Sequence, residues 1–255
     1  MQFSNKLGIF FQKFLAISGY EIRKKNQDLK KYDAKIIDII NTVKPFTMTQ
    51  YFKIAELCEA VRYIVNNKIP GAFVECGVWK GGSMMATAMT LIDEGDTERQ
   101  LYLYDTFSGM TQPTEHDVSL LSGTKAIERF DKYSIDDKSS NWCYSSTTEV
   151  SSNMKNTGYP GNNIHLIAGK VEETIPEKAP EKISLLRLDT DWYESTKHEL
   201  EHLYSRIPNG GILIIDDYDS WKGSRKAVDE FFNNCQKSLF LHRMGGKLGR
   251  IAVVY

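Results

Sequence analysis

Residues 183–191 (ISLLRLDTD) and 212–217 (ILIIDD) decide the fold that we predict for this chain. Each segment is an apolar run of strand length that ends in aspartates, and residues 200–207 between them place apolar side chains on one helical face. Residues 208–211 (PNGG) then stop that helix. Two strands joined by one crossover helix are usually parallel neighbours, so their carboxyl ends lie side by side. The pattern therefore predicts a parallel sheet that brings the two groups of aspartates together.

The same alternation of strands and helices extends in both directions along the chain. Upstream it comprises a helix at 53–66 ended by Pro70-Gly71, a strand at 72–76 (AFVEC), a helix at 83–92, and strands at 101–104 (LYLY) and 164–168 (IHLIA). Downstream it comprises an amphipathic helix marked by Ala227, Val228, Phe231 and Phe232, then strand-like runs at 239–244 and 250–255 joined by Gly245-Gly246. These elements predict an α/β fold with a mostly parallel sheet and a C-terminal antiparallel hairpin. Such an ending resembles the Rossmann-like sheet of class I methyltransferases, whereas the sheet of a dinucleotide dehydrogenase usually continues in parallel.

The chain of 255 residues is long enough for one sizeable core. We expect a helical extension over residues 1–50 and a single catalytic domain over 51–255. Residues 111–148 interrupt the domain, because they are polar, lack a long periodic run and exceed the length of an ordinary connection. This insertion is either unstructured or a lid that closes over substrate.

Composition narrows the class of partner. The formal net charge is -1 and the pI is near 6.5, so no general cationic field attracts nucleic acid, and the expected partner is a small molecule. The four cysteines lack the paired spacing of zinc sites or disulfide frameworks, which is typical of reduced thiols in a cytoplasmic protein.

An apolar stretch at residues 7–17 (LGIFFQKFLAI) contains Gln12 and Lys13 and is far shorter than the roughly 20 residues of a spanning helix. We therefore expect no stable membrane insertion, and no cleavage site of a signal peptide follows. A docking or oligomerisation helix is favoured over attachment to a membrane surface. Together with family likeness, it is the basis for expecting a homodimer or higher homo-oligomer.

Residues 75–83 (ECGVWKGGS) lie where the first strand ends and a helix begins, the position at which open α/β sheets bind ligands. The G-x-G-x-x-G spacing of a dinucleotide site is absent, which disfavours a nicotinamide cofactor. Glu75 can instead face a cationic ligand, and S-adenosylmethionine carries both an ammonium and a sulfonium. Asp105 ends the second strand, where an acid can accept both hydroxyls of a ribose. The alternative for Asp105 is a cap at the turn from strand to loop.

Asp189, Asp216 and Asp217 are predicted to converge. Carboxylates gathered at a partly buried strand end repel one another unless a cation offsets their charge, and oxygen-only ligands suit Mg²⁺, Mn²⁺ or Ca²⁺ rather than zinc. Ordinary helix caps and turn acids are the alternative. A metal could also hold a substrate hydroxyl and lower its pKa, and Asp191 is then the best candidate for the base.

His198 and His202 stand at i, i+4 on one helix, a spacing that can bind zinc. The helix also carries Glu199 and Glu201, so we interpret it as facing solvent and the histidines as solvated or locally paired. His116 and His165 are isolated, and no role is assigned to them.

Four segments together resemble the macrocin O-methyltransferase (TylF-type) family of bacterial sugar methyltransferases: LLRLDTDWYEST (185–196), PNGGILIIDDY (208–218), FVECGVWKGGS (73–83) and LYDTFSGM (103–110). The likeness runs from about Phe46 to the C-terminus. It implies a class I fold, S-adenosylmethionine, Mg²⁺ (or Mn²⁺), and methylation of a sugar hydroxyl.

The resemblance also assigns roles by position. The metal ligands of the family fall on Asp189, Asp216 and Asp217, and its catalytic acids on Asp191, the proposed base, and Asp189. The cofactor-binding positions fall on Thr47, Met48, Glu75, Gly77, Gly81 to Ser83, Asp105 and Ser108.

Residues 1–45 and 111–148 do not align with the antibiotic-tailoring members, so the acceptor stays open among a small glycoside, a nucleotide sugar and a surface-polysaccharide precursor. Within enzymes, a methyltransferase for catechol-type diols is the nearest alternative, and a nicotinamide-dependent oxidoreductase is a more distant one. A non-catalytic assembly protein that binds the cofactor or a sugar is the alternative from another class.

Overall fold

The computed structural model describes residues 29–135, 140–235, 239–246 and 249–255, and its main feature is a seven-stranded sheet. The strands are β1 (Ala72–Cys76), β2 (Leu101–Asp105), β3 (Ile164–Ala168), β4 (Ile183–Leu188), β5 (Ile212–Ile215), β6 (His242–Arg243) and β7 (Arg250–Val253). Their order is β3-β2-β1-β4-β5-β7-β6, and the first five are parallel, whereas β7 runs antiparallel to β5 and β6. The predicted mostly parallel sheet with a terminal hairpin is confirmed.

The three central strands are buried on both faces because helices cover both sides of the sheet. Every residue of β1, β4 and β5 is buried. The register pairs Cys76 with Leu188 and Leu188 with Ile215, so the three strands end at the same level. The residues that follow them therefore meet at one edge of the sheet, as the sequence predicted for the aspartates.

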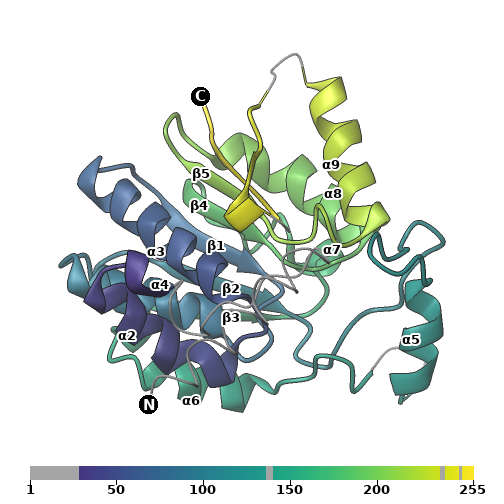
Figure 1. Ribbon diagram of the computed structural model, residues 1–255, viewed down its shortest axis with the longest axis horizontal. Coiled ribbons are helices and arrows are strands. Elements are labelled where there is room, and N and C mark those ends of the chain that lie inside the picture. Colours follow the sequence, from purple (N-terminus) through teal and green to yellow (C-terminus); the bar gives the residue numbers. More distant parts are fainter. Residues whose placement is uncertain (1–28, 136–139, 236–238, 247–248) are drawn as a thin grey trace, which may run out of the picture. The chain divides into compact units, whose positions relative to one another are not determined.

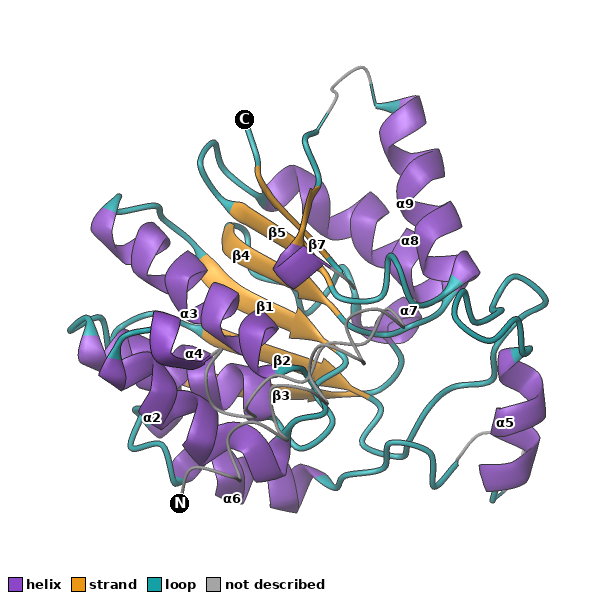
Figure 2. Ribbon diagram, viewed as in Figure 1, coloured by secondary structure: helices purple, strands orange, loops and turns teal. Residues whose placement is uncertain are grey.

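Helices form a layer on each face of the sheet (Figures 1 and 2). One layer contains α3 (Tyr51–Asn66), α4 (Gly82–Asp93) and α6 (Thr147–Lys155). The other contains α7 (Val171–Thr174), α8 (Tyr193–Leu203) and α9 (Lys222–Asn234). Between this second layer and the sheet lies a buried apolar core that includes Leu186 and Leu213 of the sheet, Leu200 of α8 and Val228 of α9. Short 3-10 helices are η2 (Lys44–Phe46), η3 (Gly161–Asn163), η4 (Tyr204–Arg206) and η5 (Met244–Gly246).

The chain divides into two units, residues 1–37 and 38–255. In the described part of the first unit, η1 (Leu29–Lys31) is followed by the start of α2 (Ala34–Val43), where Asp33 Oδ1 accepts a hydrogen bond of 3.0 Å from the Ile36 backbone N–H. The predicted apolar helix at residues 7–17 lies outside the described residues.

The insertion at 111–148 contains a helix that the sequence analysis missed, α5 (Ala126–Tyr133), with Ala126 and Phe130 buried. Trp142 of the insertion packs in T-shaped geometry on Trp192, with ring centroids 5.5 Å apart. The Lys222 N–H at the start of α9 donates to the Val118 carbonyl over 2.9 Å. These contacts argue against the unstructured alternative for the described part of the insertion.

Across the described ranges, every helix falls short of the length and hydropathy that a membrane crossing requires. All four cysteines are free thiols.

Candidate active site

The carboxyl ends of β1 and β4 touch at a glycine. Gly77 follows β1 with φ +82°, and a Cβ atom added there would lie 2.1 Å from the Asp189 carbonyl oxygen. Only glycine tolerates both the left-handed backbone and this close approach. Asp105, at the end of β2, closes the adjoining loop by accepting hydrogen bonds from the backbone N–H groups of Val78 (2.9 Å) and Trp79 (3.0 Å).

Two cavities open along this edge and share five residues, Gly77, Asp105, Gly109, Met110 and Asp189. The first cavity extends toward the segment after β3 and is further lined by Tyr104, Thr106, Thr111, Gly169, Lys170, Val171, Glu172, Thr190 and Ser195. The second has a volume of about 250 Å³ and is further lined by Met48, Thr49, Gln50, Lys53, Trp79, Cys143, Asp191, Asp216, Asp217 and Ser220. The shared wall makes them two halves of one elongated cleft.

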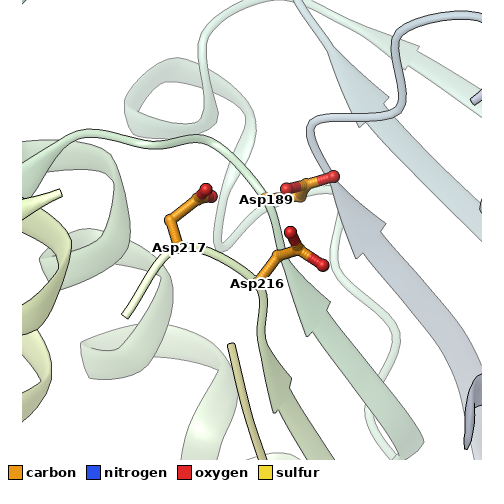
Figure 3. Close-up of side chains that lie close together, drawn as sticks. All are labelled: Asp189, Asp216 and Asp217. Atoms are coloured by element: carbon orange, nitrogen blue, oxygen red, sulfur yellow. The ribbon is translucent and has the colours of Figure 1, made fainter. Parts of the chain in front are cut away.

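Asp189, Asp216 and Asp217 converge at the ends of β4 and β5, as predicted (Figure 3). One carboxylate oxygen from each lies within 4.8 Å of the others. The Asp217 side chain is buried, and its Oδ2 has no hydrogen-bond partner. Because the donors are all carboxylate oxygens, this geometry suits a hard divalent cation.

Two buried cations face this cluster, and sequence analysis missed both. Arg187 Nη1 contacts Glu75 Oε1 and lies 2.6 Å from Asp189 Oδ2, while Nη2 lies 2.6 Å from Asp216 Oδ1. Lys53 Nζ lies 2.7 Å from Asp216 Oδ2. A signal existed for Arg187, because it is the only charged residue in the otherwise apolar strand run ISLLRL and a charge there needs buried partners.

Arg187 and Lys53 make the pKa values of the three aspartates differ. Burial opposes ionisation of Asp216, but Arg187 and then Lys53 outweigh it and hold the pKa of Asp216 below its ordinary value. Burial raises the pKa of Asp217 well above its ordinary value, and the neighbouring Asp191 and Asp216 raise it further. The pKa of Asp189 is likewise raised by burial, against the opposing effect of Arg187. The cations of the protein therefore stabilise the ionised form of Asp216, whereas burial disfavours the ionised forms of Asp189 and Asp217 unless a further cation offsets their charge.

Asp191 lines the second cavity with a strained backbone. Its φ is +69°, and two other non-glycine residues with positive φ, Trp79 and Cys143, line the same cavity. Such strain tends to collect at functional sites. Burial raises the pKa of Asp191 to about 7. A group with that pKa can exchange a proton near neutral pH.

The predicted cofactor residues fall into two groups. Met48, Gly77 and Asp105 line the cleft. The lining of the two cavities does not include Thr47, Glu75, Gly81, Ser83 or Ser108.

Glu75 is buried, and it forms an ion pair with Arg187 instead of facing the cleft. Burial raises its pKa to about 7 even though Arg187 lowers it. Asp105 acts as the cap that was its alternative role, and its Oδ1 also accepts from the Phe107 N–H over 2.8 Å. Thr47 packs near the first turn of α4, since a Cβ atom on Gly82 would lie 2.7 Å from the Thr47 Cβ. Direct contact of Glu75 and Thr47 with a cofactor stays a prediction.

The interpretation of α8 as solvent-facing is wrong at Glu199, which is 0 % exposed. Its Oε2 accepts a hydrogen bond of 3.2 Å from Thr190 Oγ1, whereas Oε1 has no partner. Burial raises the pKa of Glu199 well above its ordinary value. His198 and His202 make local contacts to the carbonyl oxygens of Ile175 (3.0 Å) and His198 (2.9 Å), and the group that could hold a metal among the described residues is the aspartate cluster.

Solved structures with the same architecture identify the class. The O-methyltransferase NovP superposes with a TM-score of 0.70 at 24% sequence identity, covering 82% of this chain and 81% of that chain. The calicheamicin methyltransferase CalS11 superposes with a TM-score of 0.61 at 17% identity, covering 91% of this chain and 99% of that chain. The fold is that of the class I methyltransferases.

The sequence matches the model of the macrocin O-methyltransferase (TylF) family over residues 9–241, so the chain belongs to that family of O-methyltransferases. The match begins well before Phe46, where the motifs placed its start. One relative is the 8-demethyl-8-(2,3-dimethoxy-alpha-L-rhamnosyl)-tetracenomycin-C 4'-O-methyltransferase of Streptomyces olivaceus, 29% identical over 72% of this chain and 67% of that protein. Another is the demethyldecarbamoylnovobiocin O-methyltransferase of Streptomyces niveus, 27% identical over the same shares.

Proposed function

We propose that this protein transfers a methyl group from S-adenosylmethionine to a sugar hydroxyl, with a divalent metal ion bound by Asp189, Asp216 and Asp217. The observation that carries the proposal is the acid cluster itself. All three acids line the second cavity, Asp189 lines the first as well, and a buried oxygen of Asp217 has no partner. The first cavity is then the nucleoside site, and the second receives the acceptor.

The nucleoside assignment rests on the residues at the ends of β2, β3 and β4. Asp105 has about one acceptor position left for a ribose hydroxyl, because a carboxylate offers about four and the N–H groups of Val78, Trp79 and Phe107 occupy three. Gly169, Lys170 and Val171, which follow β3, line the same cavity. This is where open α/β sheets bind nucleosides, outside the carboxyl ends of their strands.

The residues present fit a divalent cation of the Mg²⁺ or Mn²⁺ kind, because all donors are carboxylate oxygens and their charge exceeds that of Arg187 and Lys53. When bound, such an ion would hold the acceptor hydroxyl and lower its pKa, and S-adenosylmethionine would supply the electrophilic methyl group. Asp191 accepts the hydroxyl proton as the oxygen bonds to the methyl carbon and the carbon–sulfur bond breaks. Asp191, whose φ is +69°, lines the second cavity, where the acceptor would bind.

A sugar acceptor is supported by the other walls of the second cavity. Gln50 and Ser220 supply neutral hydrogen-bonding groups, and Trp79 supplies an aromatic surface. Neutral polar groups and aromatic rings suit a polyhydroxylated ring. The named acceptors of the relatives, a rhamnosyl tetracenomycin and a novobiocin precursor, are consistent with a glycoside.

Thermal unfolding with S-adenosylhomocysteine or NADH, each in Mg²⁺ and in EDTA, tests the cofactor assignment. Ligand at about a hundred times its Kd should add roughly 2.7 kcal/mol, a shift on the order of 5–10 °C. We expect a shift with S-adenosylhomocysteine and none with NADH. A shift with NADH alone would refute the proposal.

A homodimer or higher homo-oligomer stays a prediction from residues 7–17, as does the division into an extension at 1–50 and a domain at 51–255. Light scattering of the full chain and of a chain lacking residues 1–28 tests the first point. An oligomer that persists without that segment would contradict its role in assembly.

A further inference from the structure

Lys53 lies in an unusual place for a lysine. Its residue is 4 % exposed, and its Nζ contacts Asp216 twice, at Oδ2 over 2.7 Å and at the backbone oxygen over 3.1 Å. Lysine is almost never fully buried unless its charge is paired. Lys53 comes from the first turn of α3 and Asp216 from the end of β5, so the ion pair ties two distant segments together at the cavity.

Arg187 binds the other carboxylate oxygen of Asp216. Its Nη2 bonds Asp216 Oδ1 over 2.6 Å and Thr49 Oγ1 over 3.1 Å. Both oxygens of Asp216 are therefore engaged by cations, whereas no described residue forms an ion pair with Asp217. The acid cluster is therefore partly neutralised by two cations of the protein itself.

The acids at this edge of the sheet outnumber the cations that contact them. Glu75, Asp216 and Asp217 are buried and Asp189 and Asp191 are half-buried, and among the described residues Arg187 and Lys53 are the cations bonded to this group of carboxyls. Such a group would strongly oppose folding without these cations. With them it can stay folded before an ion arrives.

We propose that Lys53 is a resident counter-cation of the metal site, which stabilises the metal-free cluster and competes electrostatically with the incoming divalent ion. This inference rests on the proposed function, because it takes Asp216 as a metal ligand. The ammonium of Lys53 and the ion would share the Asp216 carboxylate, so each weakens the binding of the other. The consequence is a site that exchanges its ion readily instead of holding it permanently.

The test is the Mn²⁺ affinity of Lys53→Gln, measured by titration calorimetry and by the Mn²⁺ electron paramagnetic resonance signal without acceptor. Glutamine keeps a hydrogen-bond donor for Asp216 but removes the charge. Removing a positive charge a few ångströms from the ion removes a repulsion, so Mn²⁺ should bind at least about tenfold more tightly than to the wild type. The Tm in EDTA should fall, and the rise on adding Mn²⁺ should exceed the rise in the wild type.

Lys53→Arg keeps the positive charge, so it should bind Mn²⁺ with the affinity of the wild type. Lys182→Gln is the matched surface control, since Lys182 is exposed and lines a different pocket, and it should also bind Mn²⁺ as the wild type does. If Lys53→Gln bound Mn²⁺ no more tightly than the wild type, the inference that Lys53 competes with the metal ion would be refuted. If the wild type itself bound no Mn²⁺, the proposed metal dependence would fail instead, so the two failures are distinguishable.

Discussion

Replacing Asp217 by asparagine removes one charge from the acid cluster while keeping the size of the side chain. Asp217 is 7% exposed, its Oδ2 lacks a partner, and its nearest carboxylates belong to Asp216, Asp189 and Asp191. In the metal-free protein the charge of Asp217 therefore opposes folding. In the metal-bound protein the same charge would be a ligand.

The magnitude follows from the spacing of the carboxylates. Two unit charges at the 4.8 Å limit of the cluster repel by about 3 kcal/mol at an effective dielectric constant of about 20. Protonation of the cluster limits this loss, so we expect Asp217→Asn to stabilise the metal-free protein by about 1–3 kcal/mol. That corresponds to a Tm higher by roughly 3–10 °C for a chain of this length.

The assay is thermal unfolding of wild type and Asp217→Asn in EDTA and in Mg²⁺. In EDTA the variant should have a higher Tm than the wild type. Only the wild type should gain in Tm from Mg²⁺, so in Mg²⁺ the difference in Tm between the two proteins should shrink or change sign. Methyl transfer by the variant should be largely abolished, with S-adenosylhomocysteine binding retained. A variant that is less stable in EDTA and gains as much from Mg²⁺ as the wild type would refute the charge argument.

Three further predictions test individual residues. Asp191→Asn should lower the single-turnover rate by about 10²–10⁴-fold with the Mg²⁺ shift intact, and an unchanged rate would remove Asp191 as the base. Because burial raises the pKa of Glu199 above 4.5, its ionisation penalty is absent below about pH 4.5 and grows as pH rises toward the folded-state pKa. Glu199→Gln should therefore raise the Tm by a few °C near pH 8 and not near pH 4.5, whereas a benefit independent of pH would contradict the assignment. Gly77→Ala should lower the Tm by more than Gly95→Ala, because Gly95 shares a positive φ (+77°) but has open space around its Cβ position; equal losses would show that backbone strain alone matters.

The sequence predicted the sheet and the convergence of the aspartates because both depend on local patterns. Mainly apolar runs mark β1, β4 and β5, and the carboxyl ends of parallel neighbours lie at one edge of the sheet. The acids that follow β4 and β5 could therefore be placed together without knowing any side-chain contact.

The partners of those acids could not be predicted in the same way. Lys53 reaches Asp216 across 163 residues of sequence, and no periodicity encodes such a pair. Glu199 is part of a helix with a polar sequence, so no sequence pattern indicated that this side chain is buried and hydrogen-bonded to Thr190. The α5 helix was missed because it has few apolar residues, and these cluster with Trp142 of the same insertion and with Trp192 from a distant segment.

The most direct test of metal-dependent sugar methylation is transfer of a labelled methyl group from S-adenosylmethionine to a panel of acceptors, in Mg²⁺ and in EDTA. The panel should contain neutral glycosides, nucleotide sugars and catechol-type diols. We predict labelling of a sugar hydroxyl in Mg²⁺ and its loss in EDTA. Undiminished labelling in EDTA, or labelling of catechols alone, would contradict the account.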